Sequence, residues 1–133
     1  MATITRFEDI EAWQLGRELK RAIYSATQKG EFAKNYPLRD QIRRAVISIT
    51  ANIAEGFERG GNREFIQFLS NSKGSCGEVQ DHLYTAVDET YLTQTDFQRL
   101  YDQAAAVGRK ISAFMKYLQT TEIRGQKFQS RPT

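Results

Sequence analysis

The chain has 133 residues, of which 40% are hydrophobic and 26% are charged, and its formal net charge is +3. This length suits one domain, and the absence of any run of about 18 apolar residues excludes a membrane-spanning helix. The first residues lack the pattern of a secretory signal, and the single cysteine, Cys76, cannot form a disulfide within the chain. We therefore expect a soluble, cytoplasmic domain.

The positive charge is concentrated near the C-terminus. Residues 1–120 carry 16 Lys and Arg side chains against 15 Asp and Glu, whereas residues 121–133 add three basic side chains and one acidic one. The last segment has no helical periodicity. We expect a bundle domain over residues 1–120 and a disordered basic tail over residues 121–133.

The first apolar pattern predicts a helix from about Glu8 to Lys29, with Gly30 as its stop and residues 31–36 as a loop. Its apolar side chains recur every three or four residues, as one buried helical face requires. They are Ile10, Trp13, Leu15, Leu19, Ala22, Ile23 and Ala26.

A second helix is predicted from Pro37 to about Glu58, where Gly60 and Gly61 end it. Proline is tolerated in a first helical turn, and Tyr36, the residue before it, is expected outside helical geometry. Asn52 lies beside the expected core, where a buried amide needs a hydrogen-bond partner.

The middle of this second helix is apolar on every side. Residues 45–54 carry no charge, even on the side of the helix that faces away from the expected core. A chain of this size cannot surround such a helix alone, so we expect the protein to form oligomers. The predicted oligomer interface consists of Arg44, Ile47, Ala51, Ala54 and Glu55.

A third helix is predicted to begin with Asn62 as its N-cap and to carry one heptad seam. The seam consists of Phe65, Leu69, Ser72, Cys76, Val79, Leu83, Ala86 and Thr90. Residues 95–98 have the pattern of a capping box, which would begin a fourth helix. Its expected buried residues are Phe97, Leu100, Tyr101, Ala104, Val107, Ile111, Phe114 and Leu118.

Four helices with short connections predict an all-α fold, an antiparallel up-down-up-down four-helix bundle. No segment alternates with a period of two, so no strand is expected. Gly74 and Gly77 lie inside the third helix, where glycine is unfavourable. Close approach of another backbone is the favoured explanation, and a local kink is the alternative.

Several motifs resemble one bacterial family. They are Phe7–Ile10 with Ala12–Gln14, Gln41–Ala45, Ser48–Ile49 with Asn52–Gly56, Arg59, Glu64–Phe65 with Phe68–Leu69, and Gly74–Ser75. Over roughly residues 6–120 the chain resembles the 23S rRNA intervening-sequence proteins. The resemblance implies a four-helix bundle that forms a homopentamer, and it implies no settled activity.

A related group, the accessory variability determinant proteins of diversity-generating retroelements, has the same bundle and binds nucleic acid and a reverse transcriptase. This chain departs from the family pattern at residues 36–38 and again at residues 76–82, after Gly74 and Ser75. A partner site on the outer surface of the third helix would therefore differ here.

Catalytic chemistry is not expected. His82 is the only histidine, and Glu78 lies one turn before it. These two residues supply too few ligands for the metal site of a di-iron bundle. Cys76 falls on the apolar seam, where a thiol is inert. Phosphate-binding glycine motifs and zinc-type cysteine spacings are lacking. We expect no enzyme, cofactor or metal, with a site shared between copies at His82 and Glu78 as the alternative.

The predicted function is binding of nucleic acid, either RNA or DNA, by the oligomer. The candidate phosphate contacts are Arg39, Arg43, Arg59 and Arg63, with Lys20, Arg21 and the tail as further candidates. In a ring, a small excess of charge on each copy would become a continuous basic rim, and affinity for phosphate rises with the number of contacts. The alternatives are an ordinary solvated surface and an adaptor or scaffold whose ligand is another protein.

Overall fold

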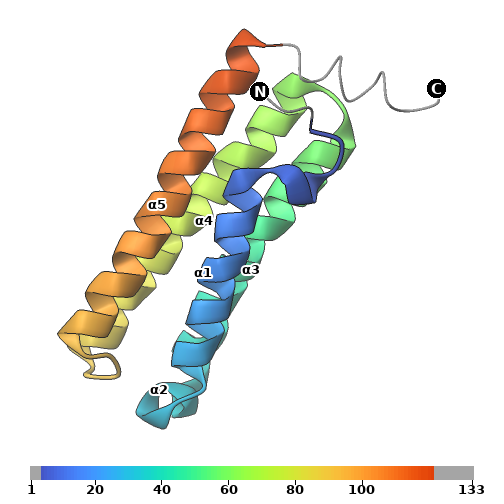
Figure 1. Cartoon of the computed structure of the whole chain (residues 1–133). Coiled ribbons are helices and arrows are strands. Elements are labelled where there is room, and N and C mark those ends of the chain that lie inside the picture. The colour runs from blue at the N-terminus through green and yellow to red at the C-terminus, as the bar shows by residue number, and fades with distance from the viewer. Residues whose placement is uncertain (1–3, 122–133) are drawn as a thin grey trace.

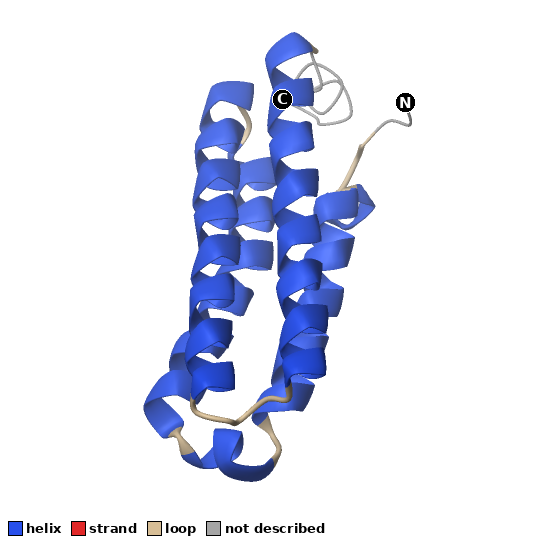
Figure 2. Ribbon diagram, turned by 90° about the vertical axis from the view of Figure 1, so that its left-hand side faces the viewer, coloured by secondary structure: helices blue, strands red, loops and turns tan. Residues whose placement is uncertain are grey.

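The computed structural model describes residues 4–121, and this part of the chain is helical without any strand (Figures 1 and 2). The elements are the 3-10 helix η1 (Phe7–Asp9) and the α-helices α1 (Glu11–Thr27), α2 (Gly30–Lys34), α3 (Tyr36–Arg59), α4 (Asn62–Asp88) and α5 (Gln94–Thr120). The predicted all-α class is confirmed. The predicted tail lies outside the described residues, apart from Thr121.

The four long helices, α1, α3, α4 and α5, lie side by side around one hydrophobic core (Figure 1). Helix α3 packs against α1 and α4, and α5 packs against α4 and α1. The short helix α2 contacts α1 and α3 at one end of the bundle. The core is one cluster to which every long helix contributes, as expected when each helix buries one apolar face.

The predicted seams are largely confirmed. Every predicted seam residue of α4 is buried except Thr90, which lies after the helix with a φ of 63°. In α5, Tyr101 and Phe114 are half-buried, and the other predicted positions are buried. Gly74 and Gly77 are exposed, and a Cβ at either would meet nothing within 4 Å, so the expected close approach of another backbone is wrong for the described chain.

The first predicted helix is shorter than expected. Ile10 has an extended conformation and separates η1 from α1, which ends at Thr27. Gly30, with a φ of 55°, begins α2 rather than ending α1, so the predicted loop at residues 31–36 is wrong. Helix α2 buries Phe32, whose ring stacks on Tyr91 with 5.7 Å between centroids. This contact from a distant segment stabilises a helix too short to persist alone.

Three helix starts differ from the sequence prediction. Tyr36 is helical, because Asn35 caps α3 by accepting a hydrogen bond from the Leu38 N–H at 3.1 Å. Helix α4 has Gly61 as its N-cap, which leaves the Asn62 side chain free to donate to the carbonyls of Leu118 and Thr121. Thr93, rather than Thr95, caps α5 and accepts from the Asp96 N–H at 3.0 Å.

Candidate interaction surfaces

The predicted oligomer interface lies along the outward side of α3. Its positions are spaced by three and four residues, which places them on one helical face. The side chain of Ile47 is 43% exposed, Ala51 is exposed and Ala54 is half-buried. Arg44 and Glu55 are exposed at the two ends of this stripe. The structure therefore brings the five predicted residues together on an open surface of the single chain.

The opposite side of α3 packs very closely against α4. A Cβ at Gly56 would lie 2.7 Å from the Cβ of Phe68 and 2.8 Å from the ring of Phe65, so only glycine fits. The buried Ser72 hydroxyl of α4 donates to the Ile49 carbonyl of α3 at 2.7 Å. These contacts hold the two helices in one register.

A polar network continues this α3–α4 contact. The amide of Asn52 donates to the carbonyl and the hydroxyl of Ser48, at 2.8 and 2.9 Å. The Ser75 hydroxyl of α4 donates to the same Ser48 hydroxyl at 2.9 Å. The predicted need of Asn52 for a partner is thus met within its own helix, and Ser48 links that amide to α4.

The predicted phosphate contacts at the beginning of α3 are largely occupied by the chain itself. The Arg43 Nε donates to the Thr27 hydroxyl at 2.8 Å, and its guanidinium lies 4.4 Å from the centroid of the Tyr24 ring. Arg39 pairs with Asp40 at 3.1 Å and donates to the Ala33 carbonyl. Both guanidinium groups are therefore held by groups of the same chain.

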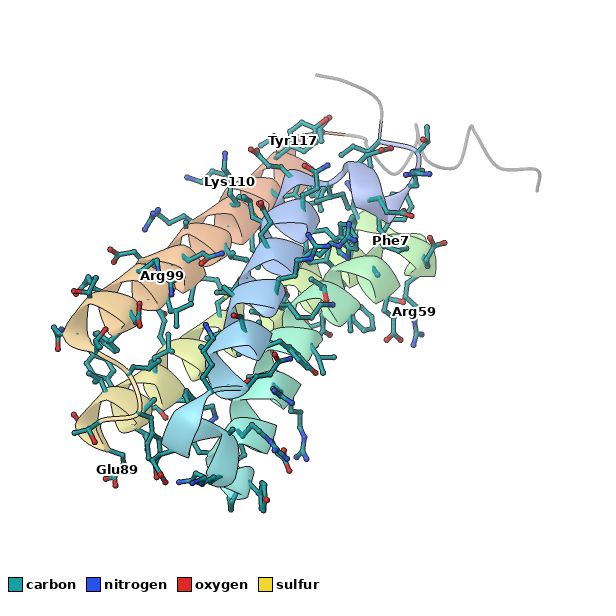
Figure 3. All side chains as sticks on the ribbon, turned by 60° about the horizontal axis from the view of Figure 1, so that its bottom comes forward. Phe7, Arg59, Glu89, Arg99, Lys110 and Tyr117 are labelled. Carbon is teal, nitrogen blue, oxygen red and sulfur yellow. The ribbon has the colours of Figure 1, made fainter. Side chains whose placement is uncertain are left out.

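The other two predicted arginines lie at the opposite end of α3, about 30 Å from Arg39 at 1.5 Å per residue. Arg59 pairs with Glu55 at 2.7 Å, and this contact raises the pKa of Arg59 (Figure 3). Arg63 is exposed in the first turn of α4. The four candidate arginines therefore form two separate pairs rather than one patch.

Neither His82 nor Cys76 forms a recognisable catalytic group with its neighbours. The Nε2 of His82 is buried without a hydrogen bond and lies 3.5 Å from Glu78 Oε2. Burial raises the pKa of Cys76 to about 12, which keeps the thiol protonated at neutral pH. Among residues 4–121, no three acidic, His or Cys side chains come close enough to hold a metal ion. None of the helices in this range is long and apolar enough to cross a membrane.

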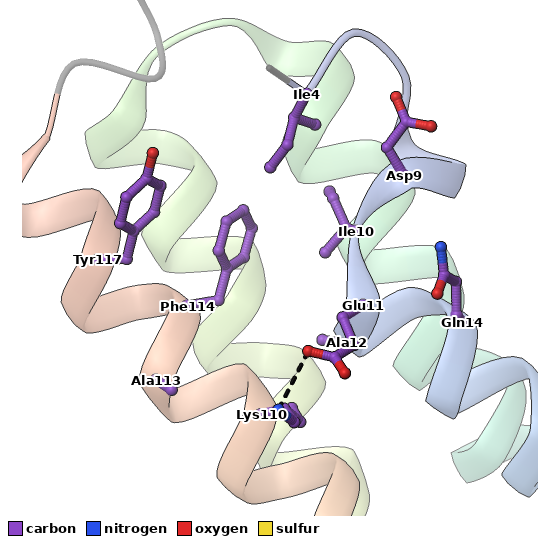
Figure 4. Close-up of a pocket in the computed structure, with 10 residues that line it drawn as sticks. All are labelled: Ile4, Asp9, Ile10, Glu11, Ala12, Gln14, Lys110, Ala113, Phe114 and Tyr117. Atoms are coloured by element: carbon purple, nitrogen blue, oxygen red, sulfur yellow. Dashed lines mark ion pairs between the residues drawn. The ribbon is translucent and has the colours of Figure 1, made fainter. Parts of the chain in front are cut away.

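A cavity of about 570 Å³ lies between the start of α1 and the end of α5 (Figure 4). Apolar lining comes from Ile10 and Phe114, among others, and the Tyr117 ring lies at one side. Lys110 of α5 reaches across to Glu11 of α1, with 3.1 Å between Nζ and Oε1. Nothing in the sequence indicates this cavity, because its lining comes from two helix ends that lie far apart in the chain.

Comparison with known proteins identifies the family. The model of the 23S rRNA-intervening sequence protein family matches residues 8–113. The chain belongs to this family. The resemblance seen in the sequence motifs is thereby confirmed, and some motif residues, among them Gly56, Phe65 and Phe68, pack α3 against α4.

A solved structure has the same fold. It is the crystal structure of a protein of unknown function from the S23 ribosomal protein family of Bacteroides thetaiotaomicron, with a TM-score of 0.72 and 19% sequence identity. The similarity covers 79% of this chain and 98% of that one. A search of curated proteins found no match to this chain.

Proposed function

We propose that this family member is a non-catalytic, self-assembling bundle whose copies meet on the outer face of α3. The observation that carries the proposal is the uncharged exposed stripe formed by Ile47, Ala51 and Ala54. Full burial of an isoleucine side chain contributes roughly 1.5–3 kcal/mol relative to full exposure. Each contact between copies would gain part of this amount from Ile47, and a closed ring would repeat the gain at every interface.

The proposed architecture is the antiparallel up-down-up-down bundle, assembled as a homopentamer. The contacts of α3 with α1 and α4, and of α5 with α4 and α1, support the bundle order. The pentamer is what the family resemblance implies. A cyclic ring needs a head-to-tail contact, in which the α3 stripe of one copy meets a different surface of the next.

The test of self-assembly is the native mass of the Ile47→Glu variant. A carboxylate in a desolvated interface lacks a partner, so the variant should remain helical but dissociate. Gln119→Glu adds the same charge on the exposed side of α5 and should leave the mass unchanged. An unchanged mass for Ile47→Glu would show that the copies meet elsewhere.

A second proposed function is nucleic-acid binding by the oligomer, in which Arg39, Arg43, Arg59 and Arg63 contact phosphate. The specific support is the set of exposed cations without a carboxylate partner in the described chain, including Arg63, Lys73 and Arg109. Repetition around a ring would multiply these contacts, and counterion release makes affinity rise with their number.

Among the four arginines, Arg63 is the one without a side-chain partner in residues 4–121, so Arg63→Gln should weaken RNA binding more than Arg43→Gln does. Anisotropy of a labelled RNA across a salt series measures both variants. Binding should fall linearly on a log–log plot of affinity against salt. An intact oligomer that binds no RNA at low salt would instead favour a scaffold for a protein partner.

A further inference from the structure

A groove of about 490 Å³ runs along the surface between α4 and α5. Three of its lining residues, Gly77, Ala104 and Gly108, have no side chain beyond Cβ, which leaves open space between the two helices. A Cβ at Gly77 would meet nothing within 4 Å. The lining residues run from Lys73 to Gln80 on α4 and from Ala104 to Ser112 on α5, which corresponds to about 10–12 Å along the helix axes.

Every polar side chain that lines this groove can donate a hydrogen bond. Lys73 and Gln80 come from α4, and Arg109 and Ser112 come from α5. No carboxylate is among the lining residues, and Lys73 and Arg109 have no acidic partner in residues 4–121. The lining therefore carries a charge of +2, in a shape that a narrow anionic chain can enter.

The other large cavity has the opposite character. The cavity between α1 and α5 is lined by Asp9 and Glu11 together with Lys110, which gives it a charge of −1. Lys110 is already paired with Glu11. An anion is therefore attracted to the α4–α5 groove and not to the cavity on the other side of α5.

We propose that the α4–α5 groove binds the phosphate backbone of single-stranded nucleic acid, with Lys73 and Arg109 contacting phosphates and Gln80 and Ser112 donating to backbone oxygens. The inference rests on the proposed nucleic-acid function and gives it a second site, separate from the arginines of α3. Charge complementarity selects the phosphate backbone, since Arg and Lys are its common partners.

The shape of the groove selects a single strand over a duplex. Packed helices lie about 8–10 Å apart axis to axis, so the depression between them admits an extended chain. Duplex recognition in the major groove instead needs a protruding helix or ribbon. No aromatic side chain lines the groove, so bases have nothing to stack on there. Binding at this site is therefore independent of sequence.

The experiment measures binding of a fluorescein-labelled 20-nucleotide poly-U RNA to the full chain by anisotropy, across a salt series. The double variant Lys73→Gln/Arg109→Gln should bind at least about tenfold more weakly at low salt. Its log–log salt slope should fall by about 1.4, which is 0.7 for each of two lost phosphate contacts. Lys29→Gln/Lys34→Gln removes the same charge at α2 and should change neither value.

A second pair of variants tests the groove without changing its charge. Gly77→Leu fills the floor and improves helix propensity, so it should fold and yet bind RNA several-fold more weakly. Gly74→Leu makes the same change at an exposed position of α4 that does not line the groove, and it should bind as the wild type does. Circular dichroism and native mass confirm that both variants are intact.

The outcomes separate the inference from the function on which it rests. Wild-type protein that binds no RNA would overturn the nucleic-acid function and the groove site together. If both charge-removing double variants reduce RNA binding equally, or if Gly77→Leu leaves RNA binding unchanged, the groove site alone is overturned. If uridine monophosphate competes as well as the RNA at equal nucleotide concentration, the groove is a site for small phosphate esters. This result would also overturn the assignment of the groove to single-stranded nucleic acid.

Discussion

The α3–α4 and α1–α5 contacts are built in opposite ways. Between α3 and α4, a missing side chain at Gly56 and the buried Ser72 hydroxyl allow the backbones to approach closely. Between α1 and α5, a cavity of about 570 Å³ separates parts of the two helices, and the Lys110–Glu11 ion pair connects them at its side (Figure 4). One contact is closed and specific, and the other is open and spanned by an exposed ion pair.

The difference shows what the family motif encodes. Gly56 of α3, together with Phe65 and Phe68 of α4, lies at the closed α3–α4 contact, and all three belong to the family motifs. These three residues fix how the two helices pack, so their presence indicates the fold and not a ligand. Surfaces that bind a partner must be sought outside this contact, on the outer face of α3 and in the α4–α5 groove.

Thiol chemistry should give the largest contrast between the buried core, where Cys76 of α4 lies, and the exposed surface beside the α1–α5 cavity. Burial raises the pKa of Cys76 from 9.0 to about 12, so at pH 8 its thiolate fraction is roughly a thousandfold below that of an ordinary cysteine. Since the folded state disfavours the thiolate, the free energy of unfolding should also fall as pH rises above about 9.

The rate of alkylation at pH 8 measures this effect. A Cys76→Ala/Ala113→Cys variant places the only thiol at an exposed position beside the α1–α5 cavity, and it should react far faster than the wild type. Equal rates would mean that the core around Cys76 opens readily.

Gly56→Leu should be the most destabilising single substitution at the closed contact. The new side chain would collide with the Cβ of Phe68, which cannot move without shifting α4. We expect the free energy of unfolding to fall by about 3 kcal/mol, measured by urea denaturation. Gly74→Leu, whose Cβ has open space around it, is the matched control and should not destabilise the protein. A mild effect at Gly56 would show that the contact can widen.

Ser72→Ala, at the same contact, should lower the free energy of unfolding by less than Gly56→Leu does. It removes the donor to the Ile49 carbonyl and leaves that carbonyl without this bond in the core, which costs about 1–2 kcal/mol. Ser70→Ala changes an exposed hydroxyl of the same helix and should have almost no effect on urea denaturation. If the two alanine variants unfold alike, the Ser72 hydrogen bond does not contribute to the register of α3 and α4.

Lys110→Ala should lower the free energy of unfolding least, because the ion pair of Lys110 with Glu11 belongs to the open α1–α5 contact. The two side chains are 48% and 65% exposed, and such pairs contribute less than about 1 kcal/mol. Lys116→Ala, on the same helix and exposed, is the reference for removing one charge. A loss well above 1 kcal/mol relative to that reference would mean that the ion pair holds α1 and α5 together.

Sequence periodicity predicted the buried faces well, because a three- and four-residue spacing directly reflects one side of a helix. It failed for α2, whose stability depends on the contact of Phe32 with Tyr91, 59 positions later in the chain. The capping-box pattern also indicated Thr95 as the N-cap of the last helix. Thr93 and Thr95 each have a suitable residue three positions later, and only the path of the preceding loop decides between them.

The candidate site was less predictable than the fold. The outward position of Ile47, Ala51 and Ala54 follows from the pattern of one helix. The contacts of the Arg43 guanidinium do not follow from that pattern, because Thr27 and Tyr24 reach it only through the packing of α1 against α3. A list of basic residues therefore cannot show which cations remain free for a phosphate.

The side chain of Asn62 has a practical consequence for experiments on the assembly. Its two hydrogen bonds, to the carbonyls of Leu118 and Thr121, tie the first residue of α4 to the last turn of α5. Position 121 is thus a defined reference point on each copy. If the copies assemble as proposed, spin labels introduced there would report one inter-copy distance for a dimer and two for a five-membered ring.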